Sequence, residues 1–311
     1  MWDEGLLQIC ICACYIVNRV VYPARPASER GDRVYEITSQ EEDNMNILVC
    51  VKQVPDTTQI KIDPVKHTLI REGVPAILNP FDGYALEAAA RIKDKNPDTK
   101  IVVVTMGPPQ AVAVLKECVA IAADKGYLVT GRTFGGSDTL ATSYIISHAI
   151  KKIEETEGAF DAIFCGKQAI DGDTAQVGPE IAEWLGLPQV TYGLECEAVE
   201  GGLKVQKEAE NGKQIIGIKF PCLVTFTKPS FDPRYPTIKR KLAANRAKFE
   251  TLGDDFDSTM DKAHYGLAGS PTHVKKSFTP PVKQGGIKIK EETGAESAAK
   301  LAQILVDNGI I

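Results

Sequence analysis

The stretch from residue 160 to residue 187, FDAIFCGKQAIDGDTAQVGPEIAEWLGL, constrains the fold more than any other part of the chain. Ala162 to Cys165 form an uninterrupted apolar run, which is typical of a strand buried on both faces of a parallel sheet. Gly166 ends this strand, a loop of small and polar residues follows, and apolar residues recur at helical spacing from Val177 to Leu185. A strand, a glycine-containing loop and a helix in this order predict one unit of an α/β sheet.

The loop of this unit is a candidate site for an anion. Backbone N–H groups in a loop that opens a helix, together with the helix N-terminus, attract phosphate groups. The glycine spacing is not G-x-G-x-x-G and the lysine-serine pair of a P-loop is missing, so these residues indicate an anion or nucleotide site of no particular class. The alternative is that Asp171 or Asp173 only caps the helix.

Strands and helices alternate along the rest of the chain. Apolar runs predict strands at 47–51 and 99–107, and helical spacing predicts helices over 84–95, 110–122 and 139–155, the first capped by Asp82. Hairpins are expected at 60–78 and 190–209. This order predicts a mainly parallel α/β sheet. Ligands of such sheets bind at the carboxyl ends of the strands, so loops 52–56, 106–109 and 166–174 should converge on one ligand.

Composition excludes some classes of partner and location. The net charge is −5 and no basic stripe stands out, so we expect no nucleic-acid partner. The chain has eight cysteines, and those in apolar strands, such as Cys50, Cys165 and Cys222, favour reduced and buried thiols in the cytoplasm.

The first 44 residues differ from the remainder. The apolar run from Leu6 to Val17 is shorter than the ~20 residues that a membrane-spanning helix needs. Asp3 and Glu4 stand where a signal peptide carries basic residues. We therefore interpret residues 1–44 as a non-native or disordered extension, expect no membrane insertion, and take Met45 as the start of the folded chain.

The composition changes again after residue 230. A basic segment is followed by a stretch rich in proline, glycine and serine, and the chain ends in an amphipathic helix at 296–311. We expect residues 45–235 to form the α/β nucleotide-binding domain and residues 236–311 to form an arm whose final helix packs on a partner chain. The alternative is that this arm returns to its own domain.

Several motifs point to a known family. They are VCVKQVPD, NPFDGYALEAA, TMGPP, GKQAIDGDTAQVGPEIAEWLGLPQVT and KFPCLVTFTKPSFDPRYPTIKRKLAANRAKF. With them, the chain from Met45 to Ile311 resembles the beta subunit of an electron-transferring flavoprotein. The resemblance implies a Rossmann-like sheet of the adenine-nucleotide-binding type and an obligate heterodimer with an alpha subunit.

Two features resemble the electron-bifurcating members of that family. Asp82 follows Asn79-Pro80-Phe81, where ordinary members often carry cysteine, and residues 131–143, GRTFGGSDTLATS, are similar to the bifurcating stretch DRAFGGADTLATS. In ordinary members the beta site holds AMP, whereas in bifurcating members it holds a second FAD that NADH reduces. The resemblance then implies that one electron goes to ferredoxin or flavodoxin. The other passes through the alpha-subunit FAD to an acyl-CoA, enoyl- or caffeyl-CoA, or lactate type of dehydrogenase or reductase.

The resemblance also implies site residues, carried over by position. Those expected to bind the cofactor are Cys50, Lys52, Asn79, Pro80, Phe81, Asp82, Met106, Gly107, Gly166, Gln168, Asp171, Gly172, Asp173, Thr174, Gln176, Val177 and Gly178. Those expected to bind NADH are Arg132, Thr133, Phe134, Gly135, Gly136, Asp138 and Thr139, with Phe134 and the glycine pair beside a stacked nicotinamide. Without the resemblance, the glycine pair would be an ordinary hinge before a helix.

Residues 228–235 match the loop with which the family docks dehydrogenases. The implied contacts are Phe231, Arg234 and Tyr235, with Phe231 as an exposed apolar anchor, and the alternative for Phe231 is a core aromatic in a turn. We identify no nucleophile-base pair, so no catalytic residue is predicted, and no metal site, because Asp171 and Asp173 lack a third ligand. Two other functions stay open: an ordinary carrier with AMP in the site, and an adenine-nucleotide-binding module without a redox role.

Overall fold

The computed structural model describes residues 45–56, 75–275 and 286–311. The chain divides into two compact units, a larger one that includes residues 78–271 and a smaller one of residues 55–77 and 272–311. The expected N-terminal extension lies outside the described residues. Residues 60–74 of the hairpin expected at 60–78 also lie outside them.

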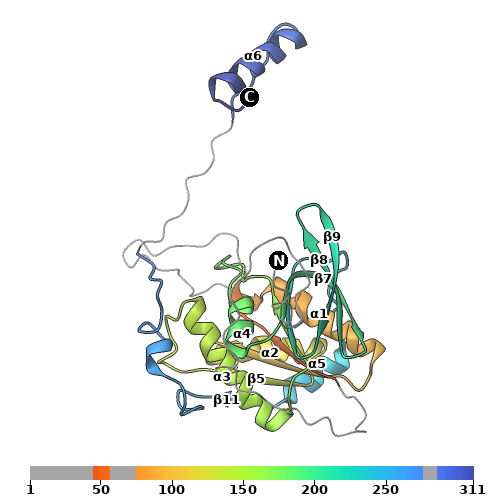
Figure 1. The fold of residues 1–311 in the computed structure, drawn as a ribbon, viewed down its shortest axis with the longest axis vertical. Coiled ribbons are helices and arrows are strands. Elements are labelled where there is room, and N and C mark those ends of the chain that lie inside the picture. Colours follow the sequence, from red (N-terminus) through yellow and green to blue (C-terminus); the bar gives the residue numbers. More distant parts are fainter. Residues whose placement is uncertain (1–44, 57–74, 276–285) are drawn as a thin grey trace, which may run out of the picture. The chain divides into compact units, whose positions relative to one another are not determined.

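A nine-stranded sheet in the order β11-β5-β4-β1-β6-β10-β7-β8-β9 forms the centre of the larger unit (Figure 1). The strands from β11 to β7 pair in parallel, while β8 and β9 extend the sheet in antiparallel pairing. The expected mainly parallel α/β sheet is therefore confirmed. Its strands are β1 (Asn46–Cys50), β4 (Lys100–Met106), β5 (Lys125–Val129), β6 (Ala162–Gly166), β7 (Gln189–Val199), β8 (Gly202–Ala209), β9 (Gly212–Lys219), β10 (Cys222–Phe226) and β11 (Glu250–Leu252).

The helices lie close to where the sequence predicts them. The first begins at Pro80 rather than at Tyr84, after Asn79, so Asp82 lies inside its first turn and is not its cap. Asp138 caps α3 by accepting the N–H of Ala141. The described α-helices are α1 (Pro80–Lys95), α2 (Val112–Ile121), α3 (Thr139–Glu157), α4 (Val177–Leu185), α5 (Ile238–Arg246) and α6 (Gly294–Asp307). Two 3-10 turns, η2 (Pro109–Ala111) and η3 (Lys262–His264), accompany them. A separate two-stranded sheet pairs β2 (Gln53–Pro55) with β3 (Ala76–Leu78).

The sheet is covered on both faces, which explains the uninterrupted apolar runs. Side chains alternate along a strand. In β1, Ile47 and Val49 join the core cluster of α1 and α2, whereas Leu48 and Cys50 join the cluster of α3 and α4. Each of these four positions of the strand is therefore apolar. Among the described residues, Cys50, Cys165 and Cys222 are buried free thiols, as the sequence predicts.

The strand order reverses between β1 and β6. From β1 the chain proceeds outward to β4 and β5 on one side, and β6 and β10 lie on the other. The crevice at the carboxyl ends of two such strands is the usual ligand position in an open α/β sheet. The loops that the sequence predicts to meet therefore flank this switch point.

The larger unit extends past the boundary expected at residue 235, as far as Pro271. It does so because β11 pairs with β5 and because Arg240 of α5 donates to the carbonyls of Val119 and Ala123 at the end of α2. None of the helices in the described ranges is long and apolar enough to cross a membrane.

Candidate functional site

The carboxylate of Asp82 joins the ends of the two strands at the switch point. Its Oδ2 accepts the N–H of Lys52 at 2.7 Å and its Oδ1 accepts the N–H of Gly166 at 3.2 Å. A Cβ at position 166 would lie 2.2 Å from Oδ1 of Asp82, so only glycine fits there. Asp82 is 6% exposed, and this burial raises its pKa to about 7 in spite of both hydrogen bonds.

Asn79 holds the loop after β6 against the loop after β1. Its Nδ2 donates to the carbonyl of Gln168 at 2.8 Å, and its Oδ1 accepts the N–H of Ile170 at 3.2 Å. Its own N–H donates to the carbonyl of Lys52 at 2.9 Å. The buried Asn79 side chain therefore fixes the relative position of the two loops.

The loop between β6 and α4 is itself ordered by polar contacts. Nζ of Lys52 lies 2.7 Å from Oδ1 of Asp171, and Nε2 of Gln168 donates to Oδ1 of Asp173 at 2.7 Å. Asp173 and Ala175 both have φ of 54°, a left-handed conformation that is unfavourable for residues other than glycine. Such backbone strain concentrates at functional sites.

The N-terminus of α4 is open. Its N-cap residue is Gln176, which makes no side-chain cap hydrogen bond, so the alternative in which Asp171 or Asp173 caps this helix is wrong. Thr174 and Gln176 are exposed. Gly178 lets the helix approach the sheet, because a Cβ there would lie 2.6 Å from Cγ2 of Thr225. The first turn of α4 can therefore donate backbone N–H groups to a ligand.

Thiols and small residues line the ends of the neighbouring strands. Cys50 and Cys165 lie side by side in the β1–β6 register, and the contact with Cys50, together with burial, raises the pKa of Cys165. Met106 and Gly107 end β4 on the other side of β1, and both are half-buried. Pro80 and Phe81 open α1 above these strand ends. The predicted cofactor residues therefore gather around one edge of the sheet.

The segment 131–139, predicted to bind NADH, leaves the same edge of the sheet after β5. Its last residue reaches the loop before α4, since Oγ1 of Thr139 lies 3.3 Å from Oε1 of Gln176 and 3.2 Å from Oε1 of Glu180. Arg132, Thr133, Gly135 and Gly136 are exposed. The structure thus connects the two predicted binding segments through Thr139.

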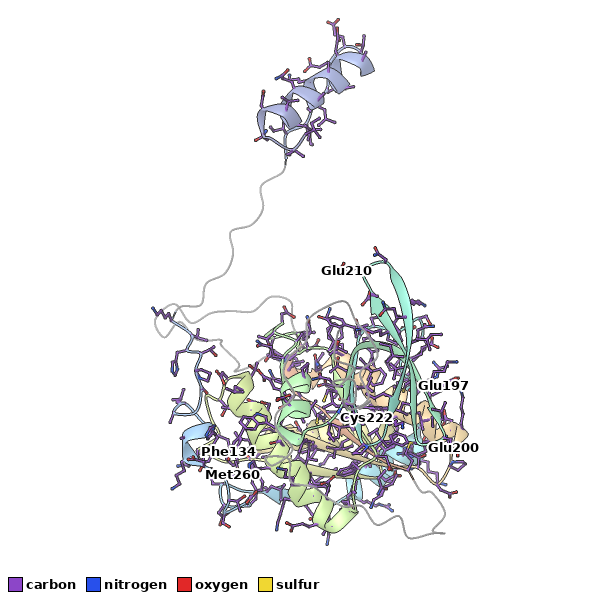
Figure 2. All side chains as sticks on the ribbon, viewed as in Figure 1. Phe134, Glu197, Glu200, Glu210, Cys222 and Met260 are labelled. Carbon is purple, nitrogen blue, oxygen red and sulfur yellow. The ribbon has the colours of Figure 1, made fainter. Side chains whose placement is uncertain are left out.

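The side chain of Phe134 points away from solvent. It is 3% exposed and packs edge-to-face on Phe256 and Tyr265, with ring centroids 6.1 and 5.6 Å away. Figure 2 shows Phe134 beside Met260. Phe134 is therefore a core residue in this structure, and its contact with a nicotinamide stays a prediction.

Residues 253–270 contact the segment 131–139 through hydrogen bonds. Asp254 accepts the N–H of Thr133 at 3.0 Å, and also its hydroxyl. Its Oδ1 lies 2.1 Å from where a Cβ of residue 131 would be, so Gly131, where the bifurcating stretch has aspartate, makes room for this carboxylate. Ser270 accepts the N–H of Asp138 at 2.9 Å.

Comparison with known proteins identifies the family. Residues 66–256 match the Electron transfer flavoprotein domain. The "Electron transfer flavoprotein subunit beta" of Megasphaera elsdenii is 52% identical over 82% of this chain and 94% of its own length. The "Caffeyl-CoA reductase-Etf complex subunit CarD" of Acetobacterium woodii is 46% identical over 86% of this chain and 100% of its own. The chain belongs to the electron transfer flavoprotein family. "Protein FixA" of Azorhizobium caulinodans is 43% identical over 77% of this chain and 86% of its own.

The segment that matches the family's docking loop lies apart from the switch point. Arg234 is tied down, because its guanidinium donates to both Glu87 and Asp94 of α1, with contacts down to 2.6 Å. Phe231 is half-buried beneath the guanidinium of Arg91, which lies 3.9 Å from its ring centroid. Tyr235 is 93% exposed. The exposed aromatic of this electron transfer flavoprotein segment is therefore Tyr235, not Phe231.

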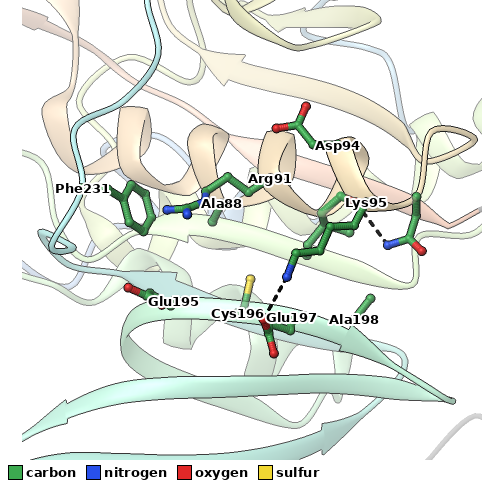
Figure 3. A pocket seen from close by; sticks show the side chains of 11 residues that line it. Ala88, Arg91, Asp94, Lys95, Glu195, Cys196, Glu197, Ala198 and Phe231 are labelled. Carbon is green, nitrogen blue, oxygen red and sulfur yellow. Dashed lines mark hydrogen bonds and ion pairs between the residues drawn. The ribbon is translucent and has the colours of Figure 1, made fainter.

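A hollow of about 530 Å³ lies between α1 and β7, beside Phe231 (Figure 3). It is bounded by Arg91 and by the ion pair of Lys95 with Glu197, 2.9 Å apart. Cys196 contributes a thiol to its wall. This hollow lies beside the segment that matches the docking loop, while the predicted cofactor residues surround the start of α1.

Sequence reasoning missed Asp254 and Glu180. Asp254 lies in no recognisable motif and is 121 residues from the Thr133 that it holds. Glu180 was visible only as a polar position between apolar ones, yet its Oε2 is buried without a partner and burial raises its pKa. Across the described ranges, no group of three or more metal-ligating side chains is present.

Proposed function

We propose that this chain is the beta subunit of a heterodimeric electron transfer flavoprotein of the bifurcating type. In this proposal the switch-point crevice holds FAD, the segment 131–139 binds NADH, and electrons leave toward ferredoxin or flavodoxin and, through the alpha-subunit FAD, toward a dehydrogenase. The observation that carries it is the uncapped N-terminus of α4 beside the switch point.

The residues present fit a dinucleotide cofactor. The helix dipole at the start of α4 favours each nearby negative charge by about 0.3–1 kcal/mol. Lys52 pairs with Asp171, so that carboxylate does not oppose a diphosphate, and a Cβ at Gly172 would meet no other atom within 4 Å. Asn79 keeps the loop in place. The bound flavin would supply the redox chemistry, while the chain supplies position, insulation from water and charge.

Contact with NADH is proposed for the exposed part of the segment. Arg132 offers a cation, and Gly135 and Gly136 offer backbone without side chains. The buried side chain of Phe134 attaches this segment to the core. We expect Arg132→Gln to weaken NADH reduction of the flavin about tenfold, as the loss of one charged contact does, while Arg246→Gln on α5 should leave it unchanged.

The bifurcating assignment rests on the relatives and on two positions. One relative is named as a subunit of a caffeyl-CoA reductase complex. Asp82 and most of the stretch 131–143, apart from Gly131, Thr133 and Ser137, carry the bifurcating type of residue, and Asp82 lies at the switch point itself. By the same family resemblance, Tyr235 becomes the exposed contact for a dehydrogenase, and Arg234 and Phe231 shape its loop.

The experiment that tests the proposal is co-expression with an alpha subunit, a count of FAD and AMP per heterodimer, and an anaerobic titration with NADH. Two FAD, no AMP and bleaching of the flavin by NADH are expected. One FAD with one AMP and no response to NADH would make this an ordinary carrier. A purified chain that binds adenine nucleotides and forms no heterodimer would instead make it a non-redox module.

The docking proposal has its own test in acceptor reduction by the heterodimer. Tyr235→Ala should raise the KM for the partner dehydrogenase, because it removes an exposed aromatic contact. Phe231→Ala should raise this KM less, because its half-buried ring affects the order of the loop and not the contact itself. Equal KM values for Tyr235→Ala and the unaltered protein would refute the contact.

A further inference from the structure

Asp82 is a buried carboxyl group whose charge lacks a direct counter-ion. Its side chain lies in the first turn of α1 and accepts the backbone N–H groups of Lys52 and Gly166, and a hydrogen bond with the side chain of Asn79 also lowers its pKa. Both oxygens stay acceptors when the group is ionised. Among the described ion pairs, none includes Asp82.

The groups that face Asp82 come from four elements. The loop after β1 contributes Lys52, the residue before α1 contributes the amide of Asn79, and β6 contributes the thiol of Cys165, which lies beside Cys50. The helix α2 contributes Cys118, whose pKa is raised by burial and then by the charges of Glu117 and Asp82. Apart from the N-terminus of α1, Lys52 is the only positive group among these, and its ammonium is already paired with Asp171 at 2.7 Å.

An anion in the crevice would favour the neutral form of the Asp82 carboxyl group over the ionised form. The open N-terminus of α4 and the loop before it adjoin Gly166 and Asp171, so a phosphate seated there adds negative potential near Asp82. Lys52 is half exposed and is the cation within reach of that phosphate. Both effects favour the neutral form of a buried carboxyl. Glu180, in the first turn of α4, is a second carboxyl group at this edge whose pKa is raised by burial, so a variant at Asp82 is needed to assign the proton to Asp82.

We propose that Asp82 takes up a proton from solvent when an anionic nucleotide occupies the switch-point crevice, so that the carboxylate becomes a neutral carboxylic acid. One proton moves and no electron does. The inference rests on the proposed function, because it requires a nucleotide at this site, and it adds a proton-binding role for one residue. It predicts that nucleotide affinity depends on pH through Asp82.

The test counts protons during binding. The heterodimer is stripped of flavin and titrated calorimetrically with FAD, whose diphosphate does not ionise near neutrality, in two buffers of unlike ionisation enthalpy at pH 6, 7 and 8. Asp82→Asn removes the titrating group and keeps one amide oxygen as acceptor. Asp161→Asn is the matched control, since Asp161 accepts the N–H of Asn46 at the opposite end of β1.

The unaltered protein and Asp161→Asn should take up about half a proton per FAD more than Asp82→Asn at pH 7. The excess should shrink at pH 6, where Asp82 already carries its proton. Equal proton uptake with and without Asp82 would overturn this inference and leave the nucleotide site intact. Failure of FAD and AMP to bind the heterodimer would overturn the proposed function and the inference together. If Asp82→Asn does not fold, a flat pH dependence of uptake in the unaltered protein refutes the inference by itself.

Discussion

The pKa values of two buried carboxyl groups in this chain are shifted in opposite directions because the partners of the two groups differ. Asp82 faces backbone N–H groups and thiols, and burial raises its pKa to about 7. Glu157, at the end of α3, would also be raised by burial, but hydrogen bonds from Lys100, Lys125 and Tyr127 lower its pKa to about 2. Burial alone therefore does not decide the charge of a carboxyl group. The number of cationic partners does.

For Asp82 the folded pKa lies above the unfolded value of 3.8, so the group stabilises the fold at low pH and this contribution is lost as pH rises through about 7. Relative to Asp82→Asn, the unfolding free energy of the unaltered chain should fall by about 1.4 kcal/mol per pH unit between pH 4 and 7. Urea unfolding at several pH values measures the difference. Parallel curves for the two proteins would contradict it.

For Glu157 the sign is reversed, since its folded pKa lies below the unfolded value of 4.5. Its stabilisation should be complete above about pH 4.5 and vanish as pH falls toward 2. Glu157→Gln should cost about 1–3 kcal/mol at pH 7, because Lys100 and Lys125 are about one-third exposed and partly screened. The same urea series tests this, and an equal loss at pH 2.5 and pH 7 would be the wrong outcome.

At the scale of elements, α1 connects the candidate cofactor site with the docking segment. Its first turn carries Asp82, and its middle and end carry Glu87, Arg91 and Asp94, which hold residues 231–234. A loop that binds partners is usually held by a rigid element beneath it. The segment is therefore positioned by a helix that also borders the crevice.

Arg234→Lys should loosen this attachment. Lysine cannot reproduce the bidentate contact, and Glu87, which is 5% exposed, would lose much of its pairing, so we expect a loss of about 2–3 kcal/mol. Hydrogen exchange should accelerate at residues 228–237. Arg246→Lys, at the end of α5, serves as the control. Unchanged exchange in Arg234→Lys would show that the clamp does not order the loop.

At the scale of the whole molecule, the terminal helix of the smaller unit has no buried face. Its helix α6 has a capping box made by Thr293 and Glu296, yet none of its residues is buried. Leu301 and Val306 are 48% and 55% exposed. A helix of this length is marginal on its own. An alpha-subunit surface as its partner stays a prediction, in keeping with the expected C-terminal arm.

Deleting residues 286–311 should leave the thermal midpoint of the larger unit unchanged, because none of the residues of α6 is buried. The same deletion should weaken binding to the alpha subunit by about tenfold or more, the effect of losing one or two buried apolar side chains. Leu301→Asp should mimic the deletion and Lys300→Gln should not. A deletion that lowers the thermal midpoint but spares heterodimer affinity would show an intramolecular role instead.

The sequence by itself determined the elements of this protein and its family. Apolar runs such as Ala162 to Cys165 predict a strand covered on both faces, and helical spacing predicts α3 and α4. Each pattern follows from the burial of side chains along one segment. The loop after β6 is a predicted anion site because of its order between a strand and a helix. These inferences need only neighbouring residues.

Only the tertiary structure decided which partners the predicted residues have. Asp82 is not a helix cap because the ends of β1 and β6 bring the N–H groups of Lys52 and Gly166 to it. Phe134 is a core residue because Phe256 and Tyr265 return to cover it, and β11 joins the sheet by pairing with β5. The contacts of Asp82 join residues 30 and 84 positions apart, and the other contacts join residues more than a hundred positions apart. Periodicity within one element carries no information about them.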